Sequence, residues 1–380
     1  MEFSWTEEEA AYRERVAQLI ADRLPDARQQ PVALHYAADQ REEVTAFTHE
    51  LRERDLLTPH WPREYGGADA SAWMHVILGE ELWGAGEPRG PQYMSVNWIG
   101  PALMAFGNED QKRQHLSRIA AGDAFWCQGF SEPDSGSDLA SLQCRAVLDG
   151  EEYVVNGQKI WTSHTQLAEW CFLLVRTAPD AEPHRGISVL LVPMDTPGIE
   201  VRRIANLVGA SSLAEVFFTD VRVPRTNLLG VENEGWNIVR AALSYERVGA
   251  ARWHRSSLLL DVLAEWAKEH GRFHDPIVRA RFGEAKALVE AARLVVYSVI
   301  DERAKQLPPS PQAYVARVPM VWAEKLVAEL AMWLMGEEAL PADTVASRSY
   351  YPALSSGVTA GSTEVQLNLI ANLVLKLPRS

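Results

Sequence analysis

Cysteine is scarce in this chain of 380 residues, and Cys127, Cys144 and Cys171 are well separated with no C-x-x-C spacing. An odd number of scattered cysteines indicates neither a disulfide framework nor a zinc site. None of the 10 histidines has a spacing typical of a metal site either. Such sparing use of cysteine suits a reducing compartment, and we expect a cytoplasmic protein.

Basic residues are also few, since 37 Lys and Arg stand against 51 Asp and Glu and give a net charge of −14. Nucleic acid is therefore not an expected partner, because phosphate binding needs a basic surface. No apolar run approaches the roughly 18 residues of a membrane span. The segment Met1 to Glu9 lacks the basic-then-apolar layout of a secretion signal. No G-x-G-x-x-G follows a predicted strand, so the dinucleotide fold is not predicted.

Hydrophobic content of 47% and charged content of 23% are ordinary for a globular protein. The periodicity of apolar residues divides the chain into three parts. Residues 1–125 read as an N-terminal α-helical domain that begins with a capping-box pattern at Thr6 to Glu9. Residues 126–232 read as a middle β-domain, and residues 233–380 as a C-terminal α-helical bundle.

The middle part is predicted to be a small antiparallel barrel or sandwich. Its strands are expected from Arg145 to Pro224, with hairpin turns at Asp149-Gly150 and Asn156-Gly157. Long amphipathic helices follow, roughly at 236–270, 277–304, 313–335 and 362–375. We therefore expect a mainly α fold with a central β-domain.

The stretch from Trp126 to Ser163 carries the clearest chemical signal. Pro133 and Gly136 among hydroxyl and acid side chains favour a tight loop with uncovered backbone N–H groups, which suits a polar or anionic ligand. Farther on, Trp161 stands between hydroxyl residues on a predicted strand, where an indole can stack on an aromatic ring system. Each half taken alone is equally well explained as a surface turn or a core Trp.

Together, Ser131-Glu132-Pro133-Asp134-Ser135-Gly136-Ser137-Asp138 and Asn156-Gly157-Gln158-Lys159-Ile160-Trp161-Thr162-Ser163 resemble the acyl-CoA dehydrogenase family. The family's flavin-contacting segments have the form S/T-E-P-x-x-G-S-D and N-G-x-K-x-W-x-T/S. The resemblance extends from about Phe3 to about Arg379. It implies the order of helical domain, small β-barrel and helical bundle, with FAD as cofactor, an acyl-CoA or acyl-carrier thioester as substrate and an electron-transfer flavoprotein as partner.

The same resemblance assigns roles to single residues. It implies that Ser131 meets the pyrimidine edge of the flavin, Ser163 its N5 region and Trp161 its ring face. The loop around the flavin would also use Gln128, Phe130, Gly136 and Ser137, and Ser137 would contact the substrate as well.

The catalytic base is where this sequence departs most from the family. Many members carry it as the Glu of a Y-E-G-T segment, which here reads Thr359-Ala360-Gly361-Ser362. Other members carry it in an E-R pair on the first helix after the barrel, and Glu246 precedes Arg247 at that place. Residues at offsets of three, four and seven give Glu246 a largely apolar helix face, which raises a carboxyl pKa. We therefore predict Glu246 as the base, the alternative being an ordinary surface pair with Arg247.

Other carried-over positions concern the thioester and the ADP half of FAD. The backbone N–H of Ala360 would polarise the thioester carbonyl, and Ser362 and Glu364 would contact FAD, although Ser362 also reads as a plain helix N-cap. Arg272 falls near the family's pyrophosphate-binding Arg in an altered context. The Q-x-x-G-G-x-G segment is missing where Leu334 to Leu340 stand, so a partner chain is one way to complete the site. The assembly would be a homo- or hetero-oligomer, either a dimer or a tetramer.

These features predict an enzyme that oxidises a saturated acyl thioester to the trans-2-enoyl product, with Glu246 taking the α-proton while the β-hydride passes to flavin N5. Two alternatives remain. The chain could be a non-catalytic or FAD-sharing subunit of a hetero-oligomeric dehydrogenase, or a flavin-dependent N-oxygenase on the same fold.

Overall fold

The computed structural model describes residues 4–24, 41–88, 90–207, 212–246, 251–308, 310–359 and 361–378. The chain divides into two compact units. The helical unit comprises Met1–His35, Ala70–Glu87 and Arg247–Ser380, and the sheet unit comprises Tyr36–Asp69 and Pro88–Glu246. Among the described helices, none has both the length and the apolar character that a membrane span requires.

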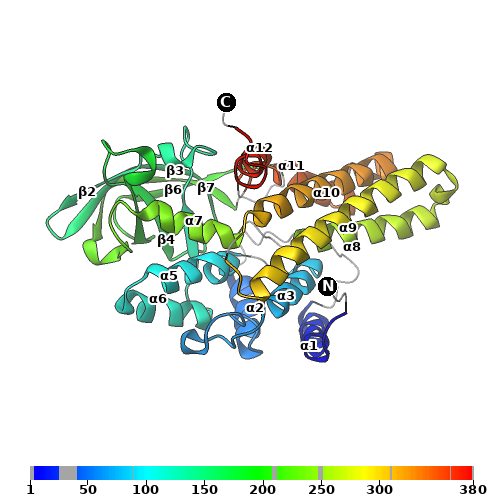
Figure 1. The fold of residues 1–380 in the computed structure, drawn as a ribbon, viewed down its shortest axis with the longest axis horizontal. Helices are drawn as coiled ribbons and strands as arrows, with labels where there is room; N and C mark the ends of the chain where they lie inside the picture. Colours follow the sequence, from blue (N-terminus) through cyan, green and yellow to red (C-terminus); the bar gives the residue numbers. More distant parts are fainter. Residues whose placement is uncertain are drawn as a thin grey trace. The chain divides into compact units, whose positions relative to one another are not determined.

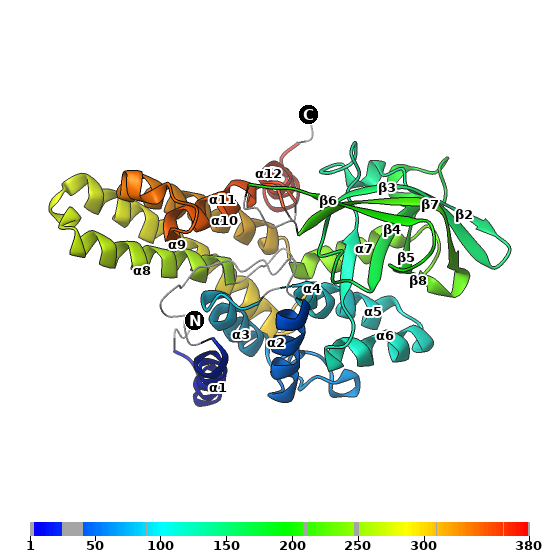
Figure 2. The same ribbon diagram turned by 180° about the vertical axis from the view of Figure 1, so that it is seen from behind.

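The helical unit is built on three long helices that lie side by side in both views, α8, α9 and α10 (Figures 1 and 2). Along α9 the buried side chains follow one another at steps of three and four residues, so one face of the helix enters the core. The described helices of this unit are α1 (Glu7–Arg23), α3 (Ala72–Gly84), α8 (Ala251–Glu269), α9 (Pro276–Ala304), α10 (Gln312–Met335), α11 (Val345–Ser355) and α12 (Thr363–Leu369), which continues as a π-helical turn (Ile370–Val374).

Helix starts in this unit follow the capping rules. Thr6 Oγ1 accepts the Glu9 N–H at 3.2 Å and Glu9 Oε2 accepts the Thr6 N–H at 2.9 Å, which confirms the predicted capping box. Ser362 Oγ accepts the Val365 N–H at 3.2 Å and so caps α12. Satisfying these N–H groups fixes where each helix begins.

One carboxylate, Glu80 on α3, is buried in this unit with 1% of its surface exposed. Arg13 Nη2 lies 3.2 Å from Glu80 Oε2, and the Tyr297 hydroxyl donates to Glu80 Oε1 at 3.1 Å. Arg13 also pairs with Glu81 at 3.0 Å. Burial raises the pKa of Glu80 to about 7, and the Arg13 charge limits the rise.

This pKa predicts a pH dependence of stability. Because the folded pKa is raised from 4.5, the contribution of Glu80 is fully present below that value and is lost as the pH rises through about 7. Glu80→Gln has no titrating group at this position. The unfolding free energy of the variant minus that of the wild type should therefore rise by about 2 kcal/mol as the pH goes from about 5 to about 8. Urea unfolding across this range measures the difference. Glu8→Gln on the exposed face of α1 is the control, and parallel curves for Glu80→Gln and wild type would contradict the prediction.

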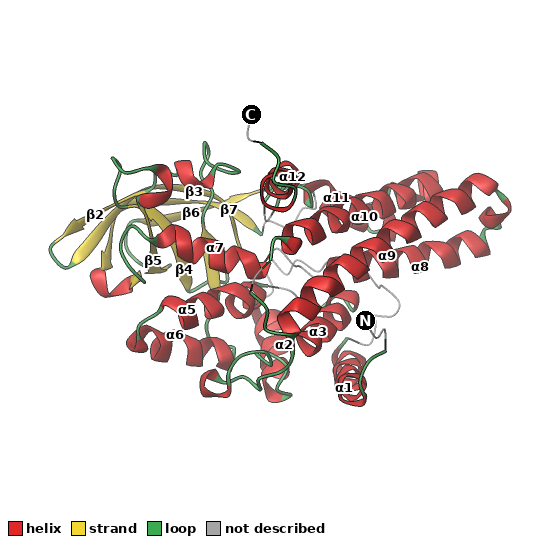
Figure 3. Cartoon of the chain, viewed as in Figure 1, coloured by secondary structure: helices red, strands yellow, loops and turns green. Residues whose placement is uncertain are grey.

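All described strands belong to the sheet unit (Figure 3). The strands are β1 (Trp126–Gly129), β2 (Arg145–Asp149), β3 (Glu152–Ser163), β4 (Trp170–Arg176), β5 (Ile187–Pro193), β6 (Ile199–Ile204), β7 (Leu213–Pro224) and β8 (Leu228–Leu229). The helices of this unit are α2 (Arg41–Glu53), α4 (Pro91–Met94), α5 (Gly100–Phe106), α6 (Glu109–Ala121) and α7 (Gly235–Glu246), with a π-helical turn (Ser95–Ile99) between α4 and α5.

The strands form one eight-stranded sheet in the order β6-β7-β3-β2-β4-β5-β8, with β1 added beside β4. Most ladders are antiparallel, as predicted, but β1 and β2 both pair with β4 in parallel. Inward side chains from β1 to β7 make one apolar core that includes all three cysteines. The sheet therefore wraps around its own core and offers its rim and outer face for binding.

The structure corrects one predicted turn. Asn156 and Gly157 lie inside the continuous strand β3, where the ladder with β7 shifts register between Val155 and Gly157. Asn156 Oδ1 accepts the N–H of Asp220, and Gly157 adopts a φ of 150° with its α-carbon close against Cys144. The Asn-Gly pair therefore lies within a strand instead of a hairpin turn, opposite a β-bulge in β7 where Thr219 and Asp220 face Asn156 alone.

Candidate functional site

Two segments far apart in the sequence meet at β1 and β3 of the sheet unit. The Ile160 N–H donates to the Ser131 carbonyl at 2.9 Å, which places the loop after β1 directly beside the end of β3. The Phe130 ring is buried, and its centroid lies 6.0 Å from that of the Phe172 ring. This packing holds the start of the loop in the core. The two motifs that resemble flavin-contacting segments therefore share one surface.

Trp161 is presented outward by a bulge in β3. The β3–β7 ladder shifts register between Lys159 and Thr162, and Trp161 has a φ of 60°, a left-handed conformation that is rare for a bulky residue. Its side chain is 56% exposed, although an indole is normally buried. Strain combined with exposure indicates a binding platform, which fits the predicted stacking role.

Unpaired polar groups gather just beyond this indole. Thr162 Oγ1, His164 Nδ1 and Thr165 Oγ1 are buried and have no hydrogen-bond partner among the described residues. Burial lowers the pKa of His164 to about 4, so its ring is neutral near pH 7. Such buried groups normally meet a ligand or an ordered water. Ser163, half-buried between them, is the predicted neighbour of flavin N5.

The remaining predicted loop residues lie along the same edge. Gln128 is half-buried on β1, while Gly136 and Ser137 are exposed on the loop. Nothing lies within 4 Å of the position that a side chain on Gly136 would take, so its loop has open space beside it. Ser135 Oγ donates to the Asp138 carbonyl at 2.8 Å and holds the turn closed.

The predicted base and the C-terminal positions lie elsewhere in the chain. Glu246 is the last residue of α7, and its side chain lies outside what the structure describes, as does all of Ala360. Ser362 and Glu364 occupy the start of α12, and Arg272 is exposed in the turn Arg272–His274. Arg272, Ser362 and Glu364 belong to the helical unit, whereas the loop residues, the β3 residues and Glu246 belong to the sheet unit.

From the sequence alone, loop capping explains Glu132, and Lys159 has no assigned role. The structure buries both side chains between the loop and β3, where they form an ion pair. A Lys at an inward strand position next to an acid in a loop motif is the signal that would have suggested it.

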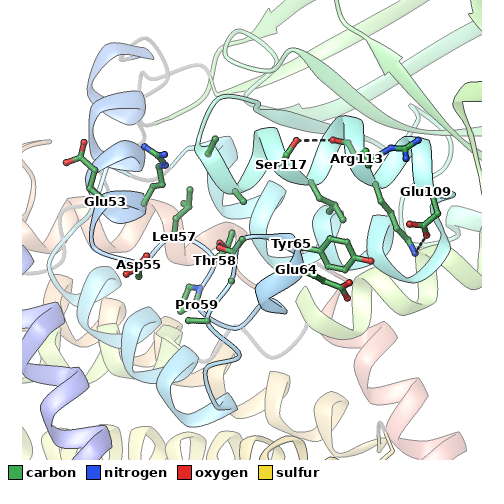
Figure 4. Close-up of a pocket in the computed structure, with 18 residues that line it drawn as sticks. Glu53, Asp55, Leu57, Thr58, Pro59, Glu64, Tyr65, Glu109, Arg113 and Ser117 are labelled. Carbon is green, nitrogen blue, oxygen red and sulfur yellow. Dashed lines mark hydrogen bonds and ion pairs between the residues drawn. The ribbon is translucent and has the colours of Figure 1, made fainter.

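A groove of about 750 Å³ lies elsewhere in the sheet unit, between the end of α2, the turn around Tyr65 and α6 (Figure 4). Its wall mixes Glu64, Glu109 and Arg113 with apolar side chains, and charges of both signs face it. None of its lining residues is a predicted site residue, so the groove has no part in the predicted chemistry.

The helical segment, the sheet with its exposed Trp161 and the helical bundle define a class, a mainly α fold in three parts with a β-domain in the middle. Sequence models of the acyl-CoA dehydrogenase N-terminal, middle and C-terminal domains match residues 6–123, 127–221 and 233–375. The chain belongs to the acyl-CoA dehydrogenase family and is an oxidoreductase of that family. The predicted fold class is thereby confirmed, and the predicted domain boundaries stay a prediction.

Several relatives match over nearly the whole chain. The acyl-CoA dehydrogenase IpdE1 of Mycobacterium tuberculosis is 35% identical over 347 residues, which cover 89% of each protein. A solved structure named Tcur3481-Tcur3483 steroid ACAD superposes with a TM-score of 0.89 at 29% identity, covering 100% of both chains. The ChsE4-ChsE5 complex from Mycobacterium tuberculosis gives a TM-score of 0.88 at 32% identity, also covering 100% of both chains.

Proposed function

We propose that this chain is an FAD-dependent dehydrogenase that converts a saturated acyl thioester into its trans-2-enoyl thioester. The observation that carries the proposal is the exposed, left-handed Trp161 beside the loop that begins at Ser131. Family membership supplies the reaction class, and this surface supplies a place for a planar ring.

The residues around β3 fit an isoalloxazine. An aromatic ring system can stack on the Trp161 indole, and polar ring edges can pair with the buried groups of Thr162 and His164 that have no partner among the described residues. Ser131 and Ser163 are half-buried, so each is partly open to solvent. Bound there, FAD would supply the acceptor for the β-hydride.

The chain's own residues would hold the substrate and take its α-proton. We propose that the Glu246 carboxylate removes this proton, which requires a poorly hydrated acid with a raised pKa. The backbone N–H of Ala360 would stabilise the charge that develops on the thioester oxygen. Ser362 and Glu364 would contact the cofactor from the start of α12, and Arg272 would meet the pyrophosphate of a neighbouring subunit's FAD.

The partners follow from the same proposal. An electron-transfer flavoprotein would reoxidise the enzyme, and a second, unlike chain would complete the ADP half of the FAD site. Two similar structures are named as two-component assemblies, which supports a hetero-oligomer. One of them is named a steroid ACAD, and we therefore place bulky, steroid-like acyl thioesters first among substrates to test. We expect the protein to work in the cytoplasm.

A visible spectrum of the purified protein, followed by anaerobic titration with a panel of acyl-CoA thioesters, tests the proposal. We expect a flavin spectrum that bleaches with at least one thioester. A colourless protein that takes up no added FAD would instead favour a non-catalytic subunit. Oxygen consumption with reduced flavin and no bleaching by thioesters would favour an N-oxygenase.

Trp161→Ala tests the stacking surface separately. Because the side chain is exposed and the left-handed backbone φ stays the same with Ala, removal of the indole should hardly change stability. FAD should be held about tenfold more weakly, as loss of one aromatic stacking partner implies. FAD fluorescence during dialysis measures retention. Trp322→Ala, at another half-exposed indole on α10, is the control. FAD content equal to wild type would contradict the stacking role.

A further inference from the structure

A buried ion pair joins the two segments of the candidate site. Lys159 Nζ lies 2.7 Å from Glu132 Oε1, and the two side chains are 0% and 7% exposed. Both residues lie in the sheet unit, beside the loop after β1 and strand β3. A charge pair so far from water is unusual, because burying each charge carries a large desolvation cost.

Both side chains of the pair also bond to the backbone. Lys159 Nζ also donates to the Phe130 carbonyl at 3.0 Å. Glu132 Oε1 accepts the Cys144 N–H at 2.8 Å, and Glu132 Oε2 accepts the Gln143 N–H at 2.6 Å. One ammonium and one carboxylate thus tie three backbone segments together, and these bonds offset the desolvation cost.

These bonds lie next to Ser131 and Trp161, the two residues predicted to contact the flavin. Phe130 and Glu132 flank Ser131, whose carbonyl accepts the Ile160 N–H. Lys159 precedes Ile160 and stands two residues before the exposed Trp161. Fixing Lys159 against both neighbours of Ser131 therefore fixes the backbone of Ser131 relative to that of β3 near Trp161.

Packing alone would not give this result. An apolar pair of equal volume could fill the same space, but it would not fix the position of the loop along β3. Directional bonds from a buried charge select one register and penalise the others, since any slip leaves a charge unpaired.

We propose that Glu132 and Lys159 are positioning residues that hold the Ser131 loop and the Trp161 bulge in register for the flavin. The proposal rests on the proposed function, because the flavin is the ligand that needs the register. Neither residue is assigned a contact with FAD or a step in the reaction.

The test uses Lys159→Met and the double variant Glu132→Gln/Lys159→Met. The single variant leaves a buried carboxylate without its partner and is expected to fold poorly. The double variant removes both charges of the pair, and the buried Arg176, on which the Glu132 charge also acts, keeps its three carbonyl acceptors. It should therefore fold with a cooperative unfolding transition. Its FAD dissociation constant should rise about tenfold, because the Phe130 carbonyl has lost its donor and the loop its register.

Two readouts separate positioning from simple stability. The visible absorption bands of bound FAD should shift in the folded double variant, and the amide protons of Gln143, Cys144 and Ile160 should exchange faster in the protein without FAD. Arg222→Met is the matched control, because it removes a cation from an exposed ion pair with Asp149 and Glu152 on the same sheet. That variant should bind FAD as the wild type does.

The outcomes distinguish this inference from the function on which it rests. Weaker FAD binding with shifted bands in the folded double variant supports the inference. Wild-type affinity and spectrum in that variant overturn it and leave the proposed function intact. A wild-type protein that binds no FAD overturns the proposed function and the inference together.

Discussion

Glu246→Gln is expected to leave FAD bound while the rate of its reduction by acyl thioesters falls about a thousandfold. A positioned general base contributes roughly 10²–10⁴ in rate, and the amide keeps the shape of the carboxylate but cannot take a proton. Affinity for the substrate should change much less than the rate, because the lost interaction belongs to proton removal. Anaerobic stopped-flow absorbance of the flavin measures the rate directly.

Glu234→Gln is the matched control for this prediction. Glu234 is exposed and lies immediately before α7, the helix that ends at Glu246, so the same chemical change is made near the same element. We expect wild-type reduction rates in this control. Reduction of Glu246→Gln at the wild-type rate would show that another group takes the α-proton.

The second large effect is expected at Trp61, which is 1% exposed in the sheet unit. Its indole N–H donates to the Val96 carbonyl at 3.0 Å, and Gly67 and Gly100 both approach it too closely to carry a side chain. Trp61→Ala should cost about 4 kcal/mol of unfolding free energy, since it opens a large cavity and leaves the Val96 carbonyl without its donor. Urea unfolding at constant pH measures the loss.

Trp161→Ala makes the same substitution at an exposed indole and should change stability by less than about 1 kcal/mol. Gly100→Ala tests Trp61 from the other side, because its added methyl would stand 2.1 Å from the indole atom Cζ2. Equal losses of unfolding free energy in Trp61→Ala and Trp161→Ala would contradict the assignment of Trp61 to the core and of Trp161 to a binding surface.

Local signals in the sequence predict much of the fold. The capping box at Thr6 and the step of three and four along α9 arise within a few residues of one helix, where the sequence contains all the information needed. The segment from Trp61 to Gly67 taken alone reads as a turn, because Val96 and Gly100, which contact the Trp61 indole, stand more than 25 positions away. The helices α5 and α11 were not predicted either.

At the candidate site, too, the local motifs were predictable and the contacts between distant segments were not. The motifs predicted that Ser131 and Trp161 belong to one surface, and the Ile160 to Ser131 bond brings their segments together. Which residues hold them there was not predictable from β3 alone. The alternation that places Tyr153 and Val155 inside continues to Lys159, but its partner Glu132 comes from a loop 27 positions earlier. The bulge between Lys159 and Thr162 then turns Trp161 outward. Bulges depend on the partner strand, which a single sequence does not place.

The reaction is tested most directly by anaerobic mixing of the FAD-loaded protein with an acyl-CoA that bleaches it, followed by mass spectrometry of the thioester. We predict one enoyl thioester, lighter by two hydrogens, for each flavin reduced. Bleaching without that product, or a flavin whose spectrum no acyl thioester alters, would contradict the assignment of α,β-dehydrogenation to this chain.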